Sequence, residues 1–470
     1  MLPQPRNYAV QPSVIPADAV SEMTIVPLER AFLLWEDEEY TITVISVNSD
    51  EENYYDPART VIKAKAHGGV LRFEFCFLGE QEHLIILEQG EKKLQEFTVF
   101  SLYEDLYKLT PLKGDLHSHS YRSDGQRDPA ALAGHYREQG YDFQALTDHN
   151  RFYPGGEVDE TYEGVRMGLV RVRGEEVHAP GSVVHIVHVG GKSSVAAQYV
   201  EDPEKFRLEA AEYEKKVPAD IPDRYRERYA KAMWATDRIH EAGGLAIFAH
   251  PYWRPGKSRM YNVCDDLAKI LLTSGMFDAY ELMGGMRLNG NNRSVALWAD
   301  LRAEGLKIPV VGSSDVHGIE KAWTFPYLFT ICFAEGSDND SIIEAVRAGR
   351  CVAVEAVGTE YERQYRCYGS LRMVTYAQYL LEHYFTERQR ICQGEGAAMR
   401  AYAMGDAPKE LIGLQADLAE RFRQRFFGRK EPLTPSEEIM RFEDKWRRIQ
   451  LNGPETKGGS IQAPPVTRQI

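Results

Sequence analysis

Hydrophobic and polar residues alternate along the first quarter of the chain. Between about 24 and 108, segments such as TITVISV, VLRFEFCFL and EFTVFSLY place apolar side chains at every second position. This is the period of a half-buried strand, and polar turns such as NSDEEN and EQGEKK separate the segments. We therefore predict a small antiparallel β-sandwich within a first domain, 1–110, with an irregular, Pro-rich start over 1–22.

The pattern changes near residue 111, where short apolar strands begin to alternate with helical stretches. The strand candidates include KGDLHSH, DFQALTDH, SVVHIVHV, GLAIFAH and KIPVVGSSD. Asp128 and Pro129 begin one helix and Gly140 ends it. This alternation predicts a parallel α/β sheet or barrel over 111–357. The charged stretch 198–228 predicts a helical insertion, either a lid over the site or a solvated surface helix.

Beyond residue 358 the pattern becomes helical and amphipathic, as in YAQYLLEHYF, DLAERFRQRFF and SEEIMRFEDKWRRI. We predict a helical extension over 358–470. It ends in a Gly/Pro-rich tail that we expect to be disordered.

Composition limits the classes of partner and compartment. The hydrophobic content of 43% is typical of a folded protein, and the net charge of −14 argues against nucleic acid as a partner. A small anionic substrate stays possible because bound metal ions reverse the local field. The six cysteines form no CxxC pair, so we expect reduced thiols and a cytoplasmic protein. Neither a secretory signal nor a membrane partner is expected, and the oligomeric state stays open.

Ten of the thirteen histidines fall between 110 and 320, which points to metal binding in that segment. His117 and His119 lie two residues apart on a predicted strand, so both side chains leave from one face and can bind one metal ion. Asp124 follows in a Ser-Asp-Gly turn. His149 ends the strand of ALTDH, and we expect the adjacent Asp148 to orient an imidazole rather than to bind metal.

The segment RGEEVHAPGSVVHIVHV offers two pairs of alternatives. Strand parity separates Glu175 from Glu176 and His185 from His188, without saying which member of each pair faces the site. Further candidates follow at the ends of two later strands. A single histidine is more often structural, but polar ligands at five separate strand ends together predict a metal site. These later candidates are His250, Asp315 and His317.

Taken in order, the motifs resemble those of the PHP (polymerase and histidinol phosphatase) superfamily, over about 111–357. The ending SSDVHG and the strand that follows it look most like the CehA/McbA-like branch. The resemblance favours Glu176 over Glu175 and His185 over His188. The matching motifs are His117-Ser118-His119 with Ser123-Asp124-Gly125, Thr147-Asp148-His149, Gly174-Glu175-Glu176 with His185, Ala249-His250-Pro251 and Ser314-Asp315-Val316-His317.

This resemblance implies a distorted (β/α)7, TIM-like barrel that holds two or three divalent metal ions. Zinc, manganese and iron all suit such His/carboxylate sites. The resemblance also implies three ligand sets that share Glu176 between the first two. The sets are His117, His119, Glu176 and Asp315; then Glu176, His185 and His250; then Asp124, His149 and His317.

A carboxylate that bridges two cations holds them about 3.5–4 Å apart, and a hydroxide between them can attack in line. We therefore predict a metal-dependent hydrolase, specifically a phosphoesterase that uses a metal-bridging hydroxide on a small, phosphorylated substrate. Hydrolysis of a carbamate, amide or ester at the same site is the alternative, and a non-catalytic, metal-stabilised binding module is a third.

Further residues beside the motifs are candidates for proton transfer and for substrate binding. We expect His178 or His188 to protonate the leaving group. Four cationic side chains could bind an anionic substrate, although exposed surface charge is the more common explanation for each. They are Arg122, Arg151, Lys192 and Arg254.

Overall fold

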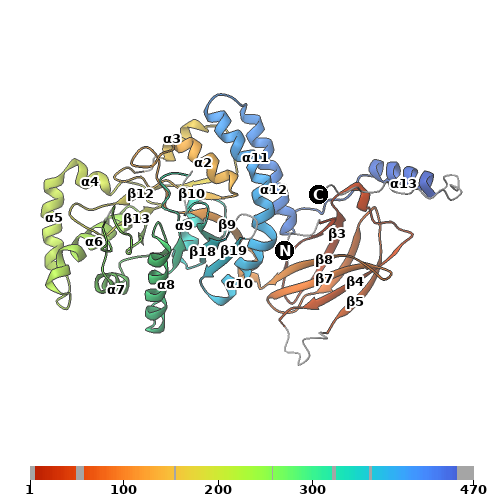
Figure 1. Cartoon of the computed structure of the whole chain (residues 1–470), viewed down its shortest axis with the longest axis horizontal. Coiled ribbons are helices and arrows are strands. Elements are labelled where there is room, and N and C mark those ends of the chain that lie inside the picture. Colours follow the sequence, from red (N-terminus) through yellow and green to blue (C-terminus); the bar gives the residue numbers. More distant parts are fainter. Residues whose placement is uncertain are drawn as a thin grey trace, which may run out of the picture.

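The computed structural model describes residues 6–48, 58–152, 155–256, 258–319, 324–358 and 363–451. Within them the chain is a mixed α/β protein (Figure 1). The tail from 452 to 470, which we predict to be disordered, lies outside these residues. None of the helices in the described ranges is long and apolar enough to cross a bilayer.

The N-terminal strands form two sheets that share one apolar core. One sheet has the order β1-β3-β6 and the other the order β2-β8-β7-β4-β5. Ile25 and Phe73 from the first sheet and Ile42 and Val99 from the second belong to the same buried cluster. The strands are β1 (Tyr8–Gln11), β2 (Val14–Pro16), β3 (Val20–Pro27), β4 (Glu39–Ser46), β5 (Thr60–Lys65), β6 (Leu71–Cys76), β7 (Gln81–Gln89) and β8 (Lys92–Leu102).

The irregular start that we predict over 1–22 is wrong from residue 8 onward. β1 pairs antiparallel with β3, and β2 pairs parallel with β8. Proline does not prevent this pairing because Pro12 lies between β1 and β2, and Pro16 is the last residue of β2.

Two further sheets form the central part of the chain. Their strand orders are β11-β10-β9-β17-β18-β19 and β12-β13-β14-β15-β16. The strands are β9 (Thr110–Asp115), β10 (Phe143–Ala145), β11 (Val170–Val172), β12 (Gly174–Val177), β13 (Ile186–Val189), β14 (Leu245–Phe248), β15 (Ala279–Met283), β16 (Val310–Gly312), β17 (Leu328–Ala334), β18 (Cys351–Val357) and β19 (Gln364–Tyr368).

Strand–helix alternation holds only in part. β9, β10 and β11 are parallel, as are β14, β15 and β16. In contrast, β12 pairs antiparallel with β13, and β13 antiparallel with β14. No helix lies between β12 and β13 in this described stretch, so the chain reverses there through a short connection.

Isolated bridges join these two sheets just beyond their strand ends. Ser118, after β9, bridges in parallel to Val316, after β16, and His149, after β10, bridges to Glu176 in β12. Backbone hydrogen bonds reinforce the first connection, with the amide of His119 donating to the carbonyl of Val316 (3.0 Å). The strand ends that carry the candidate ligands therefore meet.

Helices cover these sheets. Asp128 caps α2 by accepting a hydrogen bond from the amide of Ala131 (2.8 Å), as its sequence position predicts. The charged stretch is helical, and Phe206 of α5 packs edge-on against Trp234 of α6. The helices are α1 (Glu104–Tyr107), α2 (Pro129–Glu138), α3 (Gly155–Thr161), α4 (Ala196–Glu201), α5 (Pro203–Lys216), α6 (Asp223–Glu241), α7 (Asp265–Thr273), α8 (Leu288–Ala303) and α9 (Asn339–Arg347).

Figure 1 shows α11 and α12 between the N-terminal sheets and the rest of the chain. The amide of Ser13 donates to the carbonyl of Phe426 in α12 (2.8 Å), and the hydroxyl of Tyr379 in α10 donates to the carbonyl of Ser13 (2.9 Å), which ties the helical extension to the N-terminal strands. α11 packs closely on α2, because a Cβ at Gly396 would overlap the backbone of Gly134. The elements are α10 (Leu371–Leu380), the π-helix η2 (Leu381–Phe385), α11 (Thr386–Ala403), α12 (Lys409–Phe426) and α13 (Glu437–Leu451).

The division of the chain at residues 110 and 357 stays a prediction. β19 pairs antiparallel with β18, so the six-stranded sheet continues beyond residue 357.

Candidate metal centre

His117 and His119 follow β9 and are both buried. Their Nε2 atoms lie 3.1 Å apart. Two neutral imidazole nitrogens that both act as acceptors repel at this distance, whereas two ligand bonds of about 2.1 Å to a shared cation place their nitrogens about 3.3 Å apart. The spacing of the pair therefore suits a common metal ion.

Glu176, in β12, lies at the centre of the cluster and is 1% exposed. A carboxylate has about four lone-pair sites for hydrogen bonds, but six imidazoles surround this one. Each oxygen faces its own three rings. Oε1 lies near His178 Nε2 (3.1 Å), His185 Nδ1 (3.0 Å) and His250 Nε2 (3.2 Å). Oε2 lies near His117 Nε2 (3.3 Å), His119 Nε2 (3.4 Å) and His149 Nδ1 (3.0 Å).

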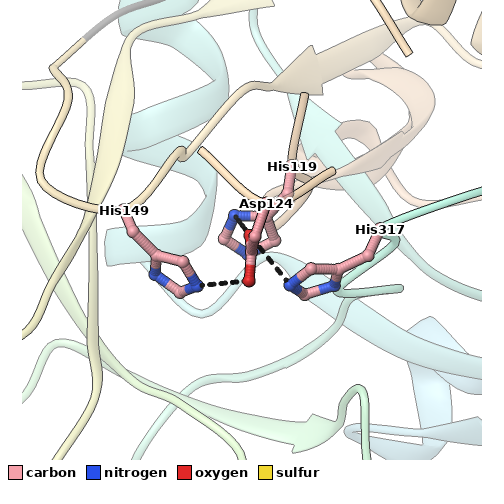
Figure 2. A group of neighbouring side chains, drawn as sticks. All are labelled: His119, Asp124, His149 and His317. Carbon is pink, nitrogen blue, oxygen red and sulfur yellow. Dashed lines mark ion pairs between the residues drawn. The ribbon is translucent and has the colours of Figure 1, made fainter. Parts of the chain in front are cut away.

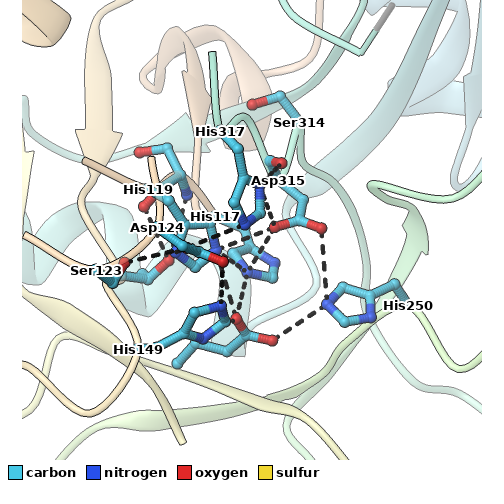
Figure 3. A network of polar contacts seen from close by, with 12 residues as sticks. His117, His119, Ser123, Asp124, His149, His250, Ser314, Asp315 and His317 are labelled. Atoms are coloured by element: carbon cyan, nitrogen blue, oxygen red, sulfur yellow. Dashed lines mark hydrogen bonds and ion pairs between the residues drawn. The ribbon is translucent and has the colours of Figure 1, made fainter. Parts of the chain in front are cut away.

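Asp315 approaches the same histidines from the chain after β16 (Figure 3). Its Oδ1 lies 3.0 Å from His119 Nε2 and 3.3 Å from His117 Nε2. The backbone of Asp315 has φ of 50°, a left-handed conformation that is uncommon for a residue with a side chain. Gly285 packs directly on the carboxylate, because a Cβ there would overlap Oδ2 of Asp315.

A second group of side chains lies at the more exposed side of the cluster (Figure 2). Asp124 Oδ1 lies 3.3 Å from His317 Nε2, and Asp124 Oδ2 lies 3.5 Å from His149 Nε2. The Asp124 side chain is 55% exposed, in contrast to the buried His117 and His119. This group therefore gives the centre its access to solvent.

All nine residues that the resemblance implies as ligands come together in one cluster. Five groups of these and neighbouring residues have candidate ligand atoms within 4.8 Å of one another, and His119 belongs to the group around Asp124 as well as to that of His117. The groups are His119, Asp124, His149 and His317; His117, His119, Glu176 and Asp315; Glu176, His185 and His250; His149, Glu176 and His178; and His117, His250 and Glu281.

The hydrogen bonding of the cluster fits bound cations. Buried polar atoms normally have a hydrogen-bond partner, and leaving one without is costly. Here several buried atoms make no hydrogen bond, although most lie at ion-pair distance from an opposite group. They are His119 Nδ1, His149 Nδ1, Glu176 Oε2, His178 Nε2, His185 Nδ1, His250 Nδ1 and Asp315 Oδ1. Divalent ions at this place would satisfy such atoms.

The electrostatics of the cluster favour positive charge. Burial opposes a charge on His117, but the carboxylates of Asp315, Glu281 and Glu176 raise its pKa well above the ordinary value. Burial also disfavours charge on His149, yet its contacts with Asp124 and Glu176 raise its pKa to about 10. Three or more carboxylates thus attract cations into a largely buried space.

Glu281 belongs to the site but was not predicted. Its Oε2 lies 2.8 Å from His117 Nδ1, and both side chains are fully buried. The one signal in the sequence is a charged residue inside the apolar strand AYELM. Carboxylates in this position orient a metal-binding imidazole.

Asp148 does not orient an imidazole as we predict. Its oxygens instead accept hydrogen bonds from the amide of Ser120 (3.0 Å) and from the hydroxyls of Ser120 (2.8 Å) and Ser123 (2.5 Å). It therefore fixes the turn that presents Asp124.

Glu175 and Glu176, and likewise His185 and His188, lie on opposite faces of their strands. Glu175 and His188 face each other across β12 and β13, with His188 Nδ1 3.0 Å from Glu175 Oε1. The His188 ring packs against Gly191 and Gly244, away from Glu176. The role of His188 as a proton donor is therefore wrong, because it points to the other face of the strand pair. His178, in contrast, lies in the cluster.

Of the four cationic candidates, Arg122 and Arg254 each have another partner. Arg122 pairs with Glu157 (2.7 Å), and the Arg254 guanidinium lies 4.5 Å from the centre of the Tyr261 ring. Lys192 follows β13 at the end remote from His185, and its amide donates to Ala242 at the end of α6. Lys192 is therefore not placed to bind substrate. For Arg122, Arg254 and the exposed Arg151, substrate binding stays a prediction.

Comparisons with known proteins give distant similarities. No family model matches the chain. It is 27% identical over 188 residues to the 5'-3' exoribonuclease of Haemophilus influenzae, across 30% of this chain and 69% of that protein. A solved two-domain protein from Bacteroides vulgatus, containing a predicted PHP-like metal-dependent phosphoesterase, is 19% identical with a TM-score of 0.36, over 56% of this chain and 76% of that one. An amidohydrolase from Chromobacterium violaceum is 20% identical with a TM-score of 0.30, over 45% and 89%. TM-scores this low do not establish a shared fold.

Proposed function

We propose that this protein is a metal-dependent phosphoesterase of the PHP superfamily, in its CehA/McbA-like branch, with a di- or trinuclear centre. The observation that carries the proposal is the position of Glu176. Its two oxygens face separate sets of three imidazoles, all within 3.4 Å. This arrangement supports a role for Glu176 as a ligand shared by two cations.

The strand pairings support a distorted (β/α)7 barrel as the scaffold. The bridge from His149 to Glu176 continues the sheet from β10 to β12, and the bridge from Ser118 to Val316 joins β9 to the chain after β16. Together with the pairings inside each sheet, these two bridges connect the strands in a closed ring that begins and ends at β9. A closed path of strands brings all the carboxyl ends of its parallel strands to one side, where barrel enzymes carry their catalytic groups.

Three sets of residues would hold the proposed ions, and Glu176 would be shared by two of the sets. His117, His119 and Asp315 would hold the first ion, and His185 and His250 the second. Imidazole and carboxylate ligands suit zinc, manganese and iron. Bound at this place, divalent ions would activate water and stabilise negative charge on the oxygens of a phosphoryl group. The ligands of the third are Asp124, His149 and His317, with His119 close by.

The surrounding residues supply positioning and proton transfer. The exposed side of the centre, at Asp124 and His317, is where a substrate can enter. His178 lies beside His149, with ring centres 4.5 Å apart, and its side chain is 28% exposed. We propose that His178 is the residue that protonates the leaving group.

Phosphoester cleavage is also the chemistry in the name of the Haemophilus relative, a 5'-3' exoribonuclease. The net charge of −14 favours a small phosphorylated molecule over a long nucleic acid. A 5'-phosphorylated oligoribonucleotide therefore belongs among the test substrates, beside phosphomonoesters and phosphodiesters.

The experiment is a substrate panel with purified protein supplied in turn with zinc, manganese and iron(II). The panel holds phosphomonoesters, phosphodiesters, the oligoribonucleotide, carbamates, amides and esters. Asp315→Asn removes charge from the cluster, and Asp300→Asn, on the exposed face of α8, is the matched control. We expect hydrolysis of at least one phosphoester, a loss of at least about 100-fold in Asp315→Asn and none in Asp300→Asn.

Turnover of carbamates, amides or esters without phosphoester hydrolysis would replace the proposal with its alternative on the same centre. No turnover of any kind, in protein that binds two or more ions, would favour a metal-stabilised binding module.

A further inference from the structure

A cavity lies at the opposite end of β9 and β11 from the candidate metal centre. Leu112 of β9 and Val170 of β11 contribute to its lining, near the starts of their strands, and α12 forms another wall. Leu112 and His117 are five residues apart, which corresponds to about 16 Å along a strand. The cavity has a volume of about 330 Å³, at the lower end of the range for small-molecule sites.

Arginines dominate the polar lining of this cavity. Arg137, Arg166, Arg388 and Arg423 line it, against the carboxylates of Asp142 and Glu420. The lining carries four guanidinium groups and two carboxylates, and Glu395 and Asp417 pair with Arg137 and Arg166 from outside the lining. The guanidinium group is a planar fork of donors that suits phosphate and carboxylate oxygens.

Two of the arginines are held rigidly by the surrounding protein. Arg137 donates from Nε to Glu395 (2.7 Å) and from Nη1 to the carbonyl of Tyr141 (2.9 Å). Arg388 pairs with Asp142 and is only 3% exposed. Its Nε is buried without a hydrogen-bond partner. Donors fixed in advance lose little entropy when a ligand binds.

The other two arginines can adjust to a ligand. The Arg166 side chain is 65% exposed and pairs with Asp417 (2.6 Å). Arg423 contacts Glu420 (2.6 Å) and the hydroxyl of Ser337 (3.1 Å). Ion pairs this close to solvent contribute little to stability, so a ligand anion can displace them.

We infer that this cavity binds a small molecule through a phosphate group, independently of the metal centre. A phosphate presents three acceptor oxygens and a charge near −2, which suits guanidinium groups that approach from α2, α11, α12 and the loop before β11. A carboxylate offers two oxygens in one plane and matches fewer of them.

The test is equilibrium dialysis of the full-length, metal-loaded protein with radiolabelled inorganic phosphate, then with adenosine monophosphate. Arg423→Gln removes one cation of the cavity. Arg421→Gln, on the same helix but outside the lining, is its matched control. Arg166→Gln removes a cation from a different element. Asp315→Asn weakens the metal centre and leaves the cavity unchanged.

We expect a phosphate site, distinct from any at the metal centre, that persists in Asp315→Asn and weakens at least 10-fold in both Arg423→Gln and Arg166→Gln, with Arg421→Gln unchanged. Adenosine, which lacks the phosphate, should compete with neither ligand. Phosphate binding that disappears in Asp315→Asn would overturn the inference, because the metal centre would then be its origin. Equal weakening in Arg421→Gln, or equal binding of adenosine, would overturn it as well.

Discussion

The Glu281 carboxylate hydrogen-bonds the Nδ1 atom of His117 at 2.8 Å, with both side chains fully buried. With a cation bound, this bond would keep the ring proton on Nδ1 and leave the Nε2 lone pair, on the side of Glu176 and Asp315, for the cation. Gly284 packs against Glu281, because a Cβ there would overlap Oε1. Glu281 therefore acts as a positioning residue that prepares His117 to bind metal.

Glu281→Gln should weaken metal binding, because the amide holds the imidazole without its negative charge. We expect a loss of roughly 10–100-fold in affinity for the ion bound by His117. Competition with a chromophoric chelator measures it. Glu304→Gln, an exposed glutamate after α8, is the control and should keep wild-type affinity. Equal affinities in Glu281→Gln and wild type would contradict the positioning role.

Gly285→Ala should displace Asp315 from the centre, because the added Cβ would overlap the Asp315 carboxylate. We expect the variant to fold but to hold fewer ions per chain, as measured by inductively coupled plasma mass spectrometry. Gly413→Ala is the matched control, since no atom lies within 4 Å of a Cβ there. In a helix interior such a change stabilises by up to about 1 kcal/mol. Unchanged metal content in Gly285→Ala would refute the close packing.

Asp124→Ala should affect only the exposed part of the centre. Asp124 contacts His149 and His317, whereas His117 and Glu176 lie deeper. We expect the variant to lose one ion per chain and to keep the others. Asp300→Ala, on the exposed surface of α8, should lose none. A loss of every ion in Asp124→Ala would mean that the groups bind metal as one unit.

His83 should make the protein less stable in acid. Burial lowers its pKa to about 4, and its ring nitrogens bond to Ser46 and Ser101. As the pH falls below about 6.5, His83 takes up a proton in the unfolded chain but not in the folded protein. The free energy of unfolding is therefore unaffected by His83 above that pH and falls between pH 6.5 and 4. The loss reaches about 3 kcal/mol at most. In urea unfolding, His83→Gln should lose less stability than wild type over this interval; parallel curves would contradict the assignment.

The elements and residues that were predictable are those with a local signal. Period-two segments predicted the strands of the N-terminal sheets, and polar residues at strand ends predicted the cluster around Glu176. These polar residues come together because the carboxyl ends of parallel strands meet at one edge of a sheet. Parity alone could not choose between Glu175 and Glu176, since both alternating faces of β12 are buried.

The features that could not be predicted depend on partners distant in the sequence. Glu281 is one glutamate in an apolar strand, and only the fold brings it 2.8 Å from His117. Asp148 lies in a motif that resembles a metal site, yet its carboxylate accepts hydrogen bonds from Ser120 and Ser123 rather than from an imidazole. The antiparallel direction of β13 explains why Lys192 was misplaced, since the sequence carries no signal of strand direction there. His188 was misplaced because it lies on the opposite face of β13 from the cluster.

The central claim is that Glu176 lies between metal ions. Crystals of the metal-loaded protein, measured by anomalous diffraction at the absorption edge of the bound element, test it directly. We predict at least two anomalous peaks within about 4 Å of each other, one on each side of the Glu176 carboxylate. Anomalous peaks absent from this cluster, or a single ion that contacts only one oxygen of Glu176, would contradict it.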